Sequence, residues 1–92
     1  MPRLTDDAIN RTLAGLEGWR REGDALARDF VLRDFVAALG FIVEVGALAE
    51  RANHHPTITN TYNRVRLELS THDEGGITER DVDLAREVNA RR

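Results

Sequence analysis

Three histidines, His54, His55 and His72, are the residues of this chain best suited to proton chemistry. An unperturbed imidazole has a pKa of about 6.5, so it can both give and take a proton near neutral pH. The first two precede Pro56, and the third lies just before a Gly-Gly pair. We expect both places to be loop junctions on rigid elements, where functional side chains are often found. If these junctions meet at one edge of a sheet, all three rings share one site.

The histidines admit three interpretations, which the residues alone leave open. They can be structural, with His54 favoured near a helix C-terminus by the dipole and His72 on a polar face. They can bind a metal, although adjacent side chains diverge and the chain has no cysteine, so we expect none. They can also act as general acids and bases.

Two carboxylates are candidate partners for a catalytic imidazole. Glu50 lies four residues before His54, so on one helical face it would fix the tautomer of that ring. Asp81 lies three residues after Thr78, where we expect it to bond back to a helix cap.

The composition excludes several other chemistries. Without cysteine there is no disulfide, thiolate metal site, iron–sulfur cluster or thiol nucleophile. All 13 basic residues are arginine, so there is no lysine for a Schiff base or a P-loop, and the only serine is Ser70. The net charge is −3 with acids and arginines interspersed, and we expect no nucleic-acid partner.

The chain of 92 residues predicts a single domain, residues 1–92, without repeats or linkers. The longest apolar run, residues 35–43, is far shorter than the ~20 residues that span a bilayer. The first residues lack the apolar core of a signal peptide. We therefore expect a cytoplasmic protein with no membrane contact. A core this small often gains from oligomerisation.

The elements are predicted in the order helix, two strands, helix, two strands, helix. Thr5, Asp34 and Thr78 are typical N-caps, and they predict helices over residues 6–14, from residue 34 to about 52, and after residue 78. Two hairpins are expected, one from strands 16–21 and 25–33 and one from strands 58–62 and 65–70 around Asn63-Arg64, where Asn tolerates a left-handed conformation. Together they predict an α+β fold, a four-stranded antiparallel sheet with three helices on one face (α-β-β-α-β-β-α).

The central helix has an unusually wide apolar surface. One stripe at helical spacing contains Phe35, Leu39, Ile42, Gly46 and Ala49, and a second contains Ala38, Phe41, Val45, Leu48 and Ala52. A helix packed on a single sheet needs only one stripe. The other indicates either deep burial or a face used for self-association.

The stretch Glu50-Arg51-Ala52-Asn53-His54-His55-Pro56 is similar to the E-x-x-x-H-H-P signature of pterin-4a-carbinolamine dehydratases. The similarity continues through Asn60, Tyr62-Asn63, Val65, Leu67, Leu69, Thr71-His72, residues 76–81 and Leu84-Ala85, and upstream through Gly18-Trp19 and Phe30-x-Leu32-x-Asp34-Phe35-x-x-Ala38-x-x-Phe41. It covers nearly the whole chain. The spacing from the His-His-Pro motif to Thr71-His72 and Asp81 makes the combination specific.

The resemblance implies an α+β fold and a homodimer or homotetramer. It implies the loss of water from 4a-hydroxytetrahydrobiopterin, which gives quinonoid dihydrobiopterin for tetrahydrobiopterin recycling. The family needs no metal and no organic cofactor for this reaction, so the expected partner is a small-molecule pterin.

The resemblance also implies roles for individual residues. His54 and His72 would donate protons to the departing hydroxyl, and His55 would mainly hold the pterin. The pocket would be lined by Asn53, Ser70, Thr71 and Asp73, with Glu50 and Asp81 in support. The alternative is a non-catalytic dimerisation or assembly factor of the same fold, since some relatives act in that way. Assembly-type members generally lose the histidines, and the presence of all three here favours the enzyme.

Overall fold

The computed structural model describes residues 2–92, which form three α-helices, four β-strands and one 3-10 turn. The elements are α1 (Asp6–Ala14), β1 (Arg20–Glu22), β2 (Ala25–Val31), α2 (Phe35–Ala52), β3 (Thr57–Thr61), β4 (Arg64–Leu69), the 3-10 turn η1 (His72–Glu74) and α3 (Glu79–Ala90). The strands pair only antiparallel, in one sheet of order β1-β2-β4-β3. The predicted α+β order and four-stranded antiparallel sheet are confirmed.

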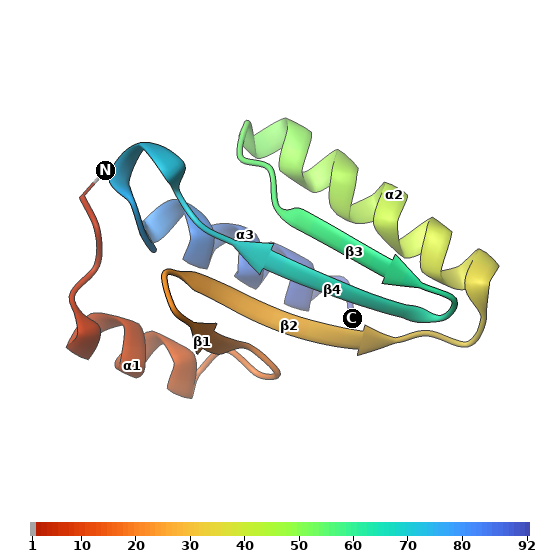
Figure 1. Ribbon diagram of the computed structural model, residues 1–92, viewed down its shortest axis with the longest axis horizontal. Helices are drawn as coiled ribbons and strands as arrows, with labels where there is room; N and C mark the ends of the chain where they lie inside the picture. The colour runs from red at the N-terminus through yellow and green to blue at the C-terminus, as the bar shows by residue number, and fades with distance from the viewer. Residues whose placement is uncertain (1) are drawn as a thin grey trace.

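One face of the sheet carries the apolar core. The register places Leu26 opposite Leu69 and Phe30 opposite Val65, so these buried side chains point to the same side. All three helices contribute side chains to this one core cluster. Figure 1 shows α3 passing behind the strands, with α1 at the β1 end and the central helix α2 following β3. The opposite face of the sheet is therefore left to solvent.

The helices begin where their capping residues predict. Thr5 accepts a hydrogen bond from the Ala8 amide and starts α1. Asp34 accepts one from the Ala37 amide at 2.8 Å and starts α2. That backbone hydrogen bond holds the pKa of Asp34 below its usual value. A side-chain oxygen at each helix start satisfies an amide that has no partner within the helix.

The predicted strand over residues 16–21 is wrong at its start, because the chain turns until residue 19 and β1 begins at Arg20. Gly18 has φ +84, and a Cβ there would lie 2.5 Å from Nε of Arg28. The turn thus lets the Arg28 side chain pass close to the backbone, where it donates to the Glu17 carbonyl at 3.0 Å. Arg28 also stacks over the ring of Phe30, so this charged residue lies on the core side of the strand.

The turn of the second hairpin is displaced by one residue from its predicted place. It is formed by Tyr62 and Asn63, and the residue with positive φ is Tyr62, at 51°. Asn63 is engaged elsewhere, since its side-chain amide donates to the Leu32 carbonyl at 3.0 Å. That bond ties the hairpin to the end of β2, an interaction that turn propensity alone does not reveal.

The central helix α2 uses mainly the second of its two apolar stripes for the core. Ala38, Phe41, Val45 and Leu48 are buried, together with Ala49. Its large apolar side chains that stay exposed are Phe35 (45%), Val36 (74%), Leu39 (43%) and Val43 (72%). Deep burial of both stripes, one of the two predicted possibilities, is wrong. Within residues 2–92 no helix is both long and apolar enough to cross a membrane.

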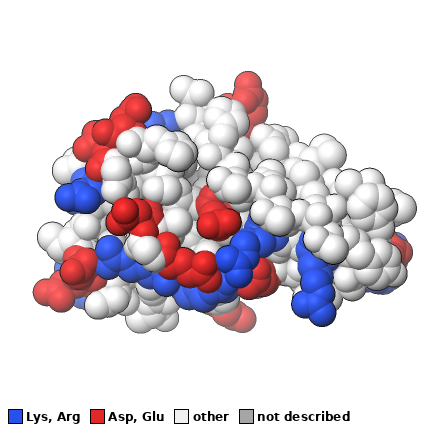
Figure 2. Space-filling model, viewed as in Figure 1, with Lys and Arg blue, Asp and Glu red and all other residues white. Residues whose placement is uncertain are grey.

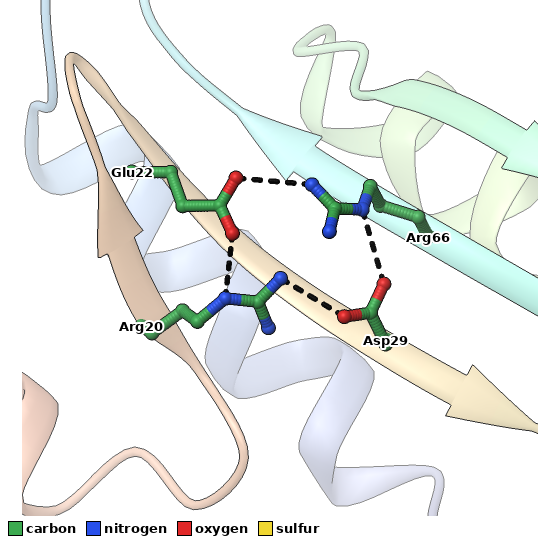
Figure 3. Close-up of polar contacts among 4 residues, drawn as sticks. All are labelled: Arg20, Glu22, Asp29 and Arg66. Carbon is green, nitrogen blue, oxygen red and sulfur yellow. Dashed lines mark hydrogen bonds and ion pairs between the residues drawn. The ribbon is translucent and has the colours of Figure 1, made fainter.

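Four charged side chains on the exposed face of the sheet are joined by ion pairs into a closed ring (Figure 3). They are Arg20, Glu22, Asp29 and Arg66. The four ion pairs measure 2.6 to 3.1 Å. Figure 2 shows charged side chains gathered over the strands, whereas the surface toward α2 is largely uncharged. The ring joins β1, β2 and β4 on the side that has no core.

The ring changes the acidity of both carboxyl groups. The hydrogen bond from Arg20 holds the pKa of Glu22 below its usual value. Desolvation raises the pKa of Asp29, but the Arg20 hydrogen bond and the charges of Arg66 and Arg20 outweigh it and leave a lowered pKa. Carboxyl groups with lowered pKa values stabilise the fold above their ordinary values, and this stabilisation is lost as the pH falls through the folded values.

We predict that Arg66→Gln weakens the dependence of stability on acid pH. The wild-type free energy of unfolding should fall steeply below about pH 4 as Glu22 and Asp29 are protonated. In the variant the same fall should be shallower, because both carboxyl groups have lost a cationic neighbour. Urea denaturation between pH 7 and pH 3 measures it, with Arg64→Gln, on the same strand β4 but outside the ring of ion pairs, as the control. Parallel curves for Arg66→Gln and the wild type would contradict the prediction.

Candidate functional site

All three histidines line one cavity of about 220 Å³. Its walls consist of Asn53, His54, His55, Ser70, Thr71, His72, Asp73 and Arg80. These residues come from the end of α2, the end of β4 with the following turn, and the first turn of α3. The seven pocket and histidine positions expected from the sequence thus lie together, although they come from two distant stretches of the chain.

The end of α2 sets the position of the adjacent histidines. Asn53 is left-handed, with φ 50, and its amide donates to the Glu50 carbonyl. The amide of His54 donates back to the Ala49 carbonyl at 3.0 Å. This pair of bonds is a Schellman motif, in which Asn replaces the more usual Gly. The chain reverses direction here, so that His54 leaves the helical path and turns inward.

A short clamped loop presents the third histidine. Thr71 and Gly76 form an isolated antiparallel bridge, with Thr71 N to Gly76 O at 2.9 Å. Between them His72 opens the 3-10 turn η1, and Gly75 closes it with φ 69 by donating to the His72 carbonyl. The His72 side chain is exposed at the cavity wall. The loop is therefore fixed at both ends while its imidazole stays accessible.

His54 is bonded to a fully buried carboxylate. Its Nε2 lies 2.5 Å from Oδ1 of Asp81, a residue with 0% exposure, and the histidine itself is 8% exposed. The other carboxylate oxygen, Oδ2, accepts from the Thr71 hydroxyl at 2.8 Å and from the Thr78 amide at 2.9 Å. Asp81 is also the N3 residue of a capping box at the start of α3, as expected. One side chain thus caps α3 and holds a candidate catalytic ring.

The expected pairing of Glu50 with His54 is wrong, because Glu50 contacts the other histidine of the pair. Its Oε1 lies 2.7 Å from Nε2 of His55, and both side chains are largely exposed. The four-residue spacing would join Glu50 to His54 only if the helix continued, and the left-handed residue at Asn53 ends it first. An exposed pair of this kind contributes little to stability, so it leaves His55 free to meet a ligand.

Sequence reasoning missed Arg80 and Thr78 as members of the site. The guanidinium of Arg80 donates to the Asn53 carbonyl at 2.5 Å, and it lines the histidine cavity. Thr78 is fully buried behind the cavity, with its hydroxyl 2.8 Å from that of Thr71. Both belong to the motif around Asp81, but only the fold shows that the first turn of α3 meets the end of α2.

The arrangement suits proton transfer to a small polar ligand. A carboxylate that holds Nε2 of His54 fixes the tautomer of the neutral ring and stabilises the ring when it is charged. Two further imidazoles and a guanidinium face the same cavity. Among residues 2–92 no group of three or more His, Asp or Glu side chains is placed to hold a metal ion.

Comparisons with known proteins agree on one family. The family model described as "Pterin 4 alpha carbinolamine dehydratase" matches residues 2–91. A Thermomicrobium roseum protein named "Putative pterin-4-alpha-carbinolamine dehydratase" is 52% identical over 88 residues, covering 96% of this chain and 95% of its own. A Rhodopseudomonas palustris protein of the same name is 49% identical over 90 residues, covering 96% of this chain and 89% of its own.

Two solved structures are similar to the fold described above. The crystal structure of a "transcriptional coactivator/pterin dehydratase" from Brucella melitensis superposes with a TM-score of 0.91 at 42% identity, covering 96% of each chain. A pterin dehydratase-like protein identified as a RuBisCO assembly factor in the alpha-carboxysome superposes with a TM-score of 0.69 at 23% identity, covering 80% of this chain and 88% of its own. At that identity the second likeness concerns the fold alone.

We predict that the two acid–histidine pairs respond separately to substitution. Asp81→Asn should change the ¹⁵N resonances of the His54 ring, because an amide oxygen replaces the carboxylate that holds Nε2. Glu50→Gln should change those of His55 and leave His54 as in the wild type. Two-dimensional NMR of ¹⁵N-histidine-labelled protein measures both, and a response of His54 to Glu50→Gln would refute the assignment.

Proposed function

This chain belongs to the pterin 4 alpha carbinolamine dehydratase family, and we propose that it removes water from 4a-hydroxytetrahydrobiopterin by general acid–base catalysis. The product is quinonoid dihydrobiopterin, which would re-enter tetrahydrobiopterin recycling. The observation that supports this most directly is the meeting of three imidazoles at one cavity, one of them bonded to a buried carboxylate.

The reaction needs one proton delivered and one removed. Hydroxide is a poor leaving group, so an acid protonates the 4a-oxygen as the C4a–O bond breaks. The lone pair of a ring nitrogen pushes the electrons out, and that nitrogen loses a proton to a base. Water leaves and the protein regains its starting charge. One well-placed acid or base accelerates such a step by roughly 10²–10⁴-fold.

The bond between His54 and Asp81 limits which nitrogen of that ring can react. Nε2 is held by the carboxylate, which leaves Nδ1 for the ligand. Nδ1 makes no hydrogen bond within residues 2–92, and no side-chain nitrogen or oxygen that is buried there lacks a partner. Nδ1 is therefore open to solvent, and we assign proton transfer to it.

The other cavity residues fit binding of the pterin edge. His72 serves as the second proton donor, from the clamped loop beside Thr71. His55 holds the ring once a pterin displaces or joins its exposed partner Glu50. The volume of about 220 Å³ lies below the roughly 300–1,000 Å³ of pockets for drug-sized ligands, and it suits a bicyclic heterocycle whose side chain reaches solvent.

A non-catalytic role in assembly remains the second candidate function. The exposed apolar face of α2 favours it. Catalysis accounts, however, for the bond between Asp81 and His54, which capping of α3 alone does not require. The two functions are compatible, because the cavity lies at the C-terminal end of α2 and the exposed apolar side chains lie in its first half.

We further propose that the exposed face of α2 binds a second copy of this chain. An 18-residue helix is about 27 Å long, and the exposed apolar side chains extend from Phe35 to Val43. A Cβ atom at Gly40 or Gly46 would have no other atom within 4 Å, so the surface at these glycines leaves room for another helix to approach. A single helical stripe is complementary to itself across a two-fold axis, which gives the expected dimer or tetramer.

We predict that His54→Ala and His72→Ala each lower kcat by about 10²- to 10⁴-fold. The fold should persist, as circular dichroism would report, since neither imidazole belongs to the apolar core, but His54→Ala should lower the stability because it removes one partner of the buried Asp81. A carbinolamine dehydration assay measures turnover, with Arg86→Ala on the outer face of α3 as the control. Wild-type turnover in both histidine variants would defeat the catalytic proposal.

We predict that Val43→Arg dissociates the oligomer. Val43 is 72% exposed in the protomer, so the new charge should spare the fold and act only on a second copy. Light scattering at micromolar concentration should give a dimer or tetramer for the wild type and a monomer for the variant. Val31→Arg is the matched control, because Val31 is 67% exposed but lies on β2. A monomeric wild type would rule out this interface.

A further inference from the structure

Two buried threonines connect the start of α3 to the carboxylate that holds His54. The Thr71 hydroxyl lies 2.8 Å from Oδ2 of Asp81 and 2.8 Å from the Thr78 hydroxyl. The Thr78 hydroxyl in turn accepts from the Arg80 amide at 3.2 Å. Thr71 is 6% exposed and Thr78 is 0% exposed. These hydroxyls therefore depend on each other, and not on solvent, for their partners.

The donor and the acceptor of each hydrogen bond in this series follow from the number of hydrogens that each group can donate. A hydroxyl has one hydrogen to donate, and a carboxylate only accepts. Thr71 therefore donates to Asp81, and its contact with Thr78 is satisfied only if Thr78 is the donor. Thr78 receives its own hydrogen bond from the Arg80 amide. The hydrogen bonds therefore all point the same way, from the first turn of α3 through the two hydroxyls to the carboxylate of Asp81.

The consequence for Asp81 is a fixed orientation. Its Oδ2 accepts from the Thr71 hydroxyl and from the Thr78 amide. Its Oδ1 is left for Nε2 of His54. With Oδ2 held by two donors, the carboxylate resists rotation, and the neutral ring must carry its hydrogen on Nε2. The tautomer with Nδ1 unprotonated is selected in this way, and Nδ1 is the nitrogen that takes up a proton and then passes it to the departing hydroxyl.

We propose that Thr71 is a positioning residue that acts on His54 through Asp81, not a residue that contacts the pterin. The proposal rests on the function proposed above and refines it, because the resemblance gave Thr71 a place in the substrate pocket. The Thr71 hydroxyl donates its one hydrogen to Asp81 and accepts a hydrogen bond from Thr78. The backbone amide and carbonyl of Thr71 are also engaged, both by Gly76.

The test measures kinetics and tautomer together in Thr71→Val, with Thr71→Ser as the conservative rescue. The Val variant should lower kcat by about tenfold or more, the usual effect of losing a group that orients a functional histidine. Its KM should stay within about twofold of the wild-type value, and Ser should restore kcat. The ¹⁵N resonances of neutral His54 should shift from a single Nε2–H tautomer toward a mixture in Thr71→Val.

A pair of cap variants separates this effect from simple loss of stability. Thr78→Val removes the donor to Thr71 and the cap of α3. Thr5→Val removes the cap of α1 but none of the hydrogen bonds that lead to Asp81. Both should lower the melting temperature, but only Thr78→Val should lower kcat and disturb His54. It also provides an independent readout if Thr71→Val does not fold.

Two results would overturn the proposal for Thr71. A raised KM with unchanged kcat in Thr71→Val would show a substrate contact and overturn the proposal. An unaltered His54 tautomer in Thr71→Val and Thr78→Val would overturn it as well. If the wild type shows no dehydration, the proposed function fails, while the tautomer measurement on the free protein still decides the role of Thr71.

Discussion

A buried carboxylate must have its oxygens satisfied by donors, since an unpaired charge in the interior is very costly. In this protein that constraint falls on Asp81, which has no exposed surface. Its donors come from three places in the chain, the start of α3, the loop after β4 and the end of α2. Satisfying one side chain therefore brings these three segments together, and the histidine cavity forms where they meet.

The rest of the fold presents the proton-transfer groups to that meeting point. The Schellman end of α2 turns His54 inward and leaves His55 exposed, so two adjacent and identical side chains acquire different surroundings. The sheet holds the end of β4 in register with β2, and the isolated bridge at Thr71 carries that order into the loop. On the far face the ionic ring takes the place of a second apolar layer. The exposed stripe of α2 lies apart from both.

Much of this architecture could be predicted from the sequence, because its signals are local. Side-chain caps at Thr5, Asp34 and Thr78 gave the helix starts, and alternation along residues 65–70 gave a half-buried strand. The cavity members followed from family resemblance. The partner of Glu50 could not be predicted, since a left-handed residue at Asn53 breaks the helical spacing on which the expectation depended. Nor could the hydroxyl chain, which joins residues on different elements through tertiary packing alone.

The central claim is that one cavity, with His54 and His72 on its walls, holds the heterocycle whose protons are moved. The most direct measurement is a crystal structure with a bound dihydropterin. We expect the bicyclic ring between these two imidazoles, with Nδ1 of His54 within the roughly 2.6–3.2 Å of a hydrogen bond to the ring or its 4a-substituent. A pterin bound instead in the groove between α2 and α3 lined by Leu48, Arg51 and Leu84, away from His72, would contradict the account.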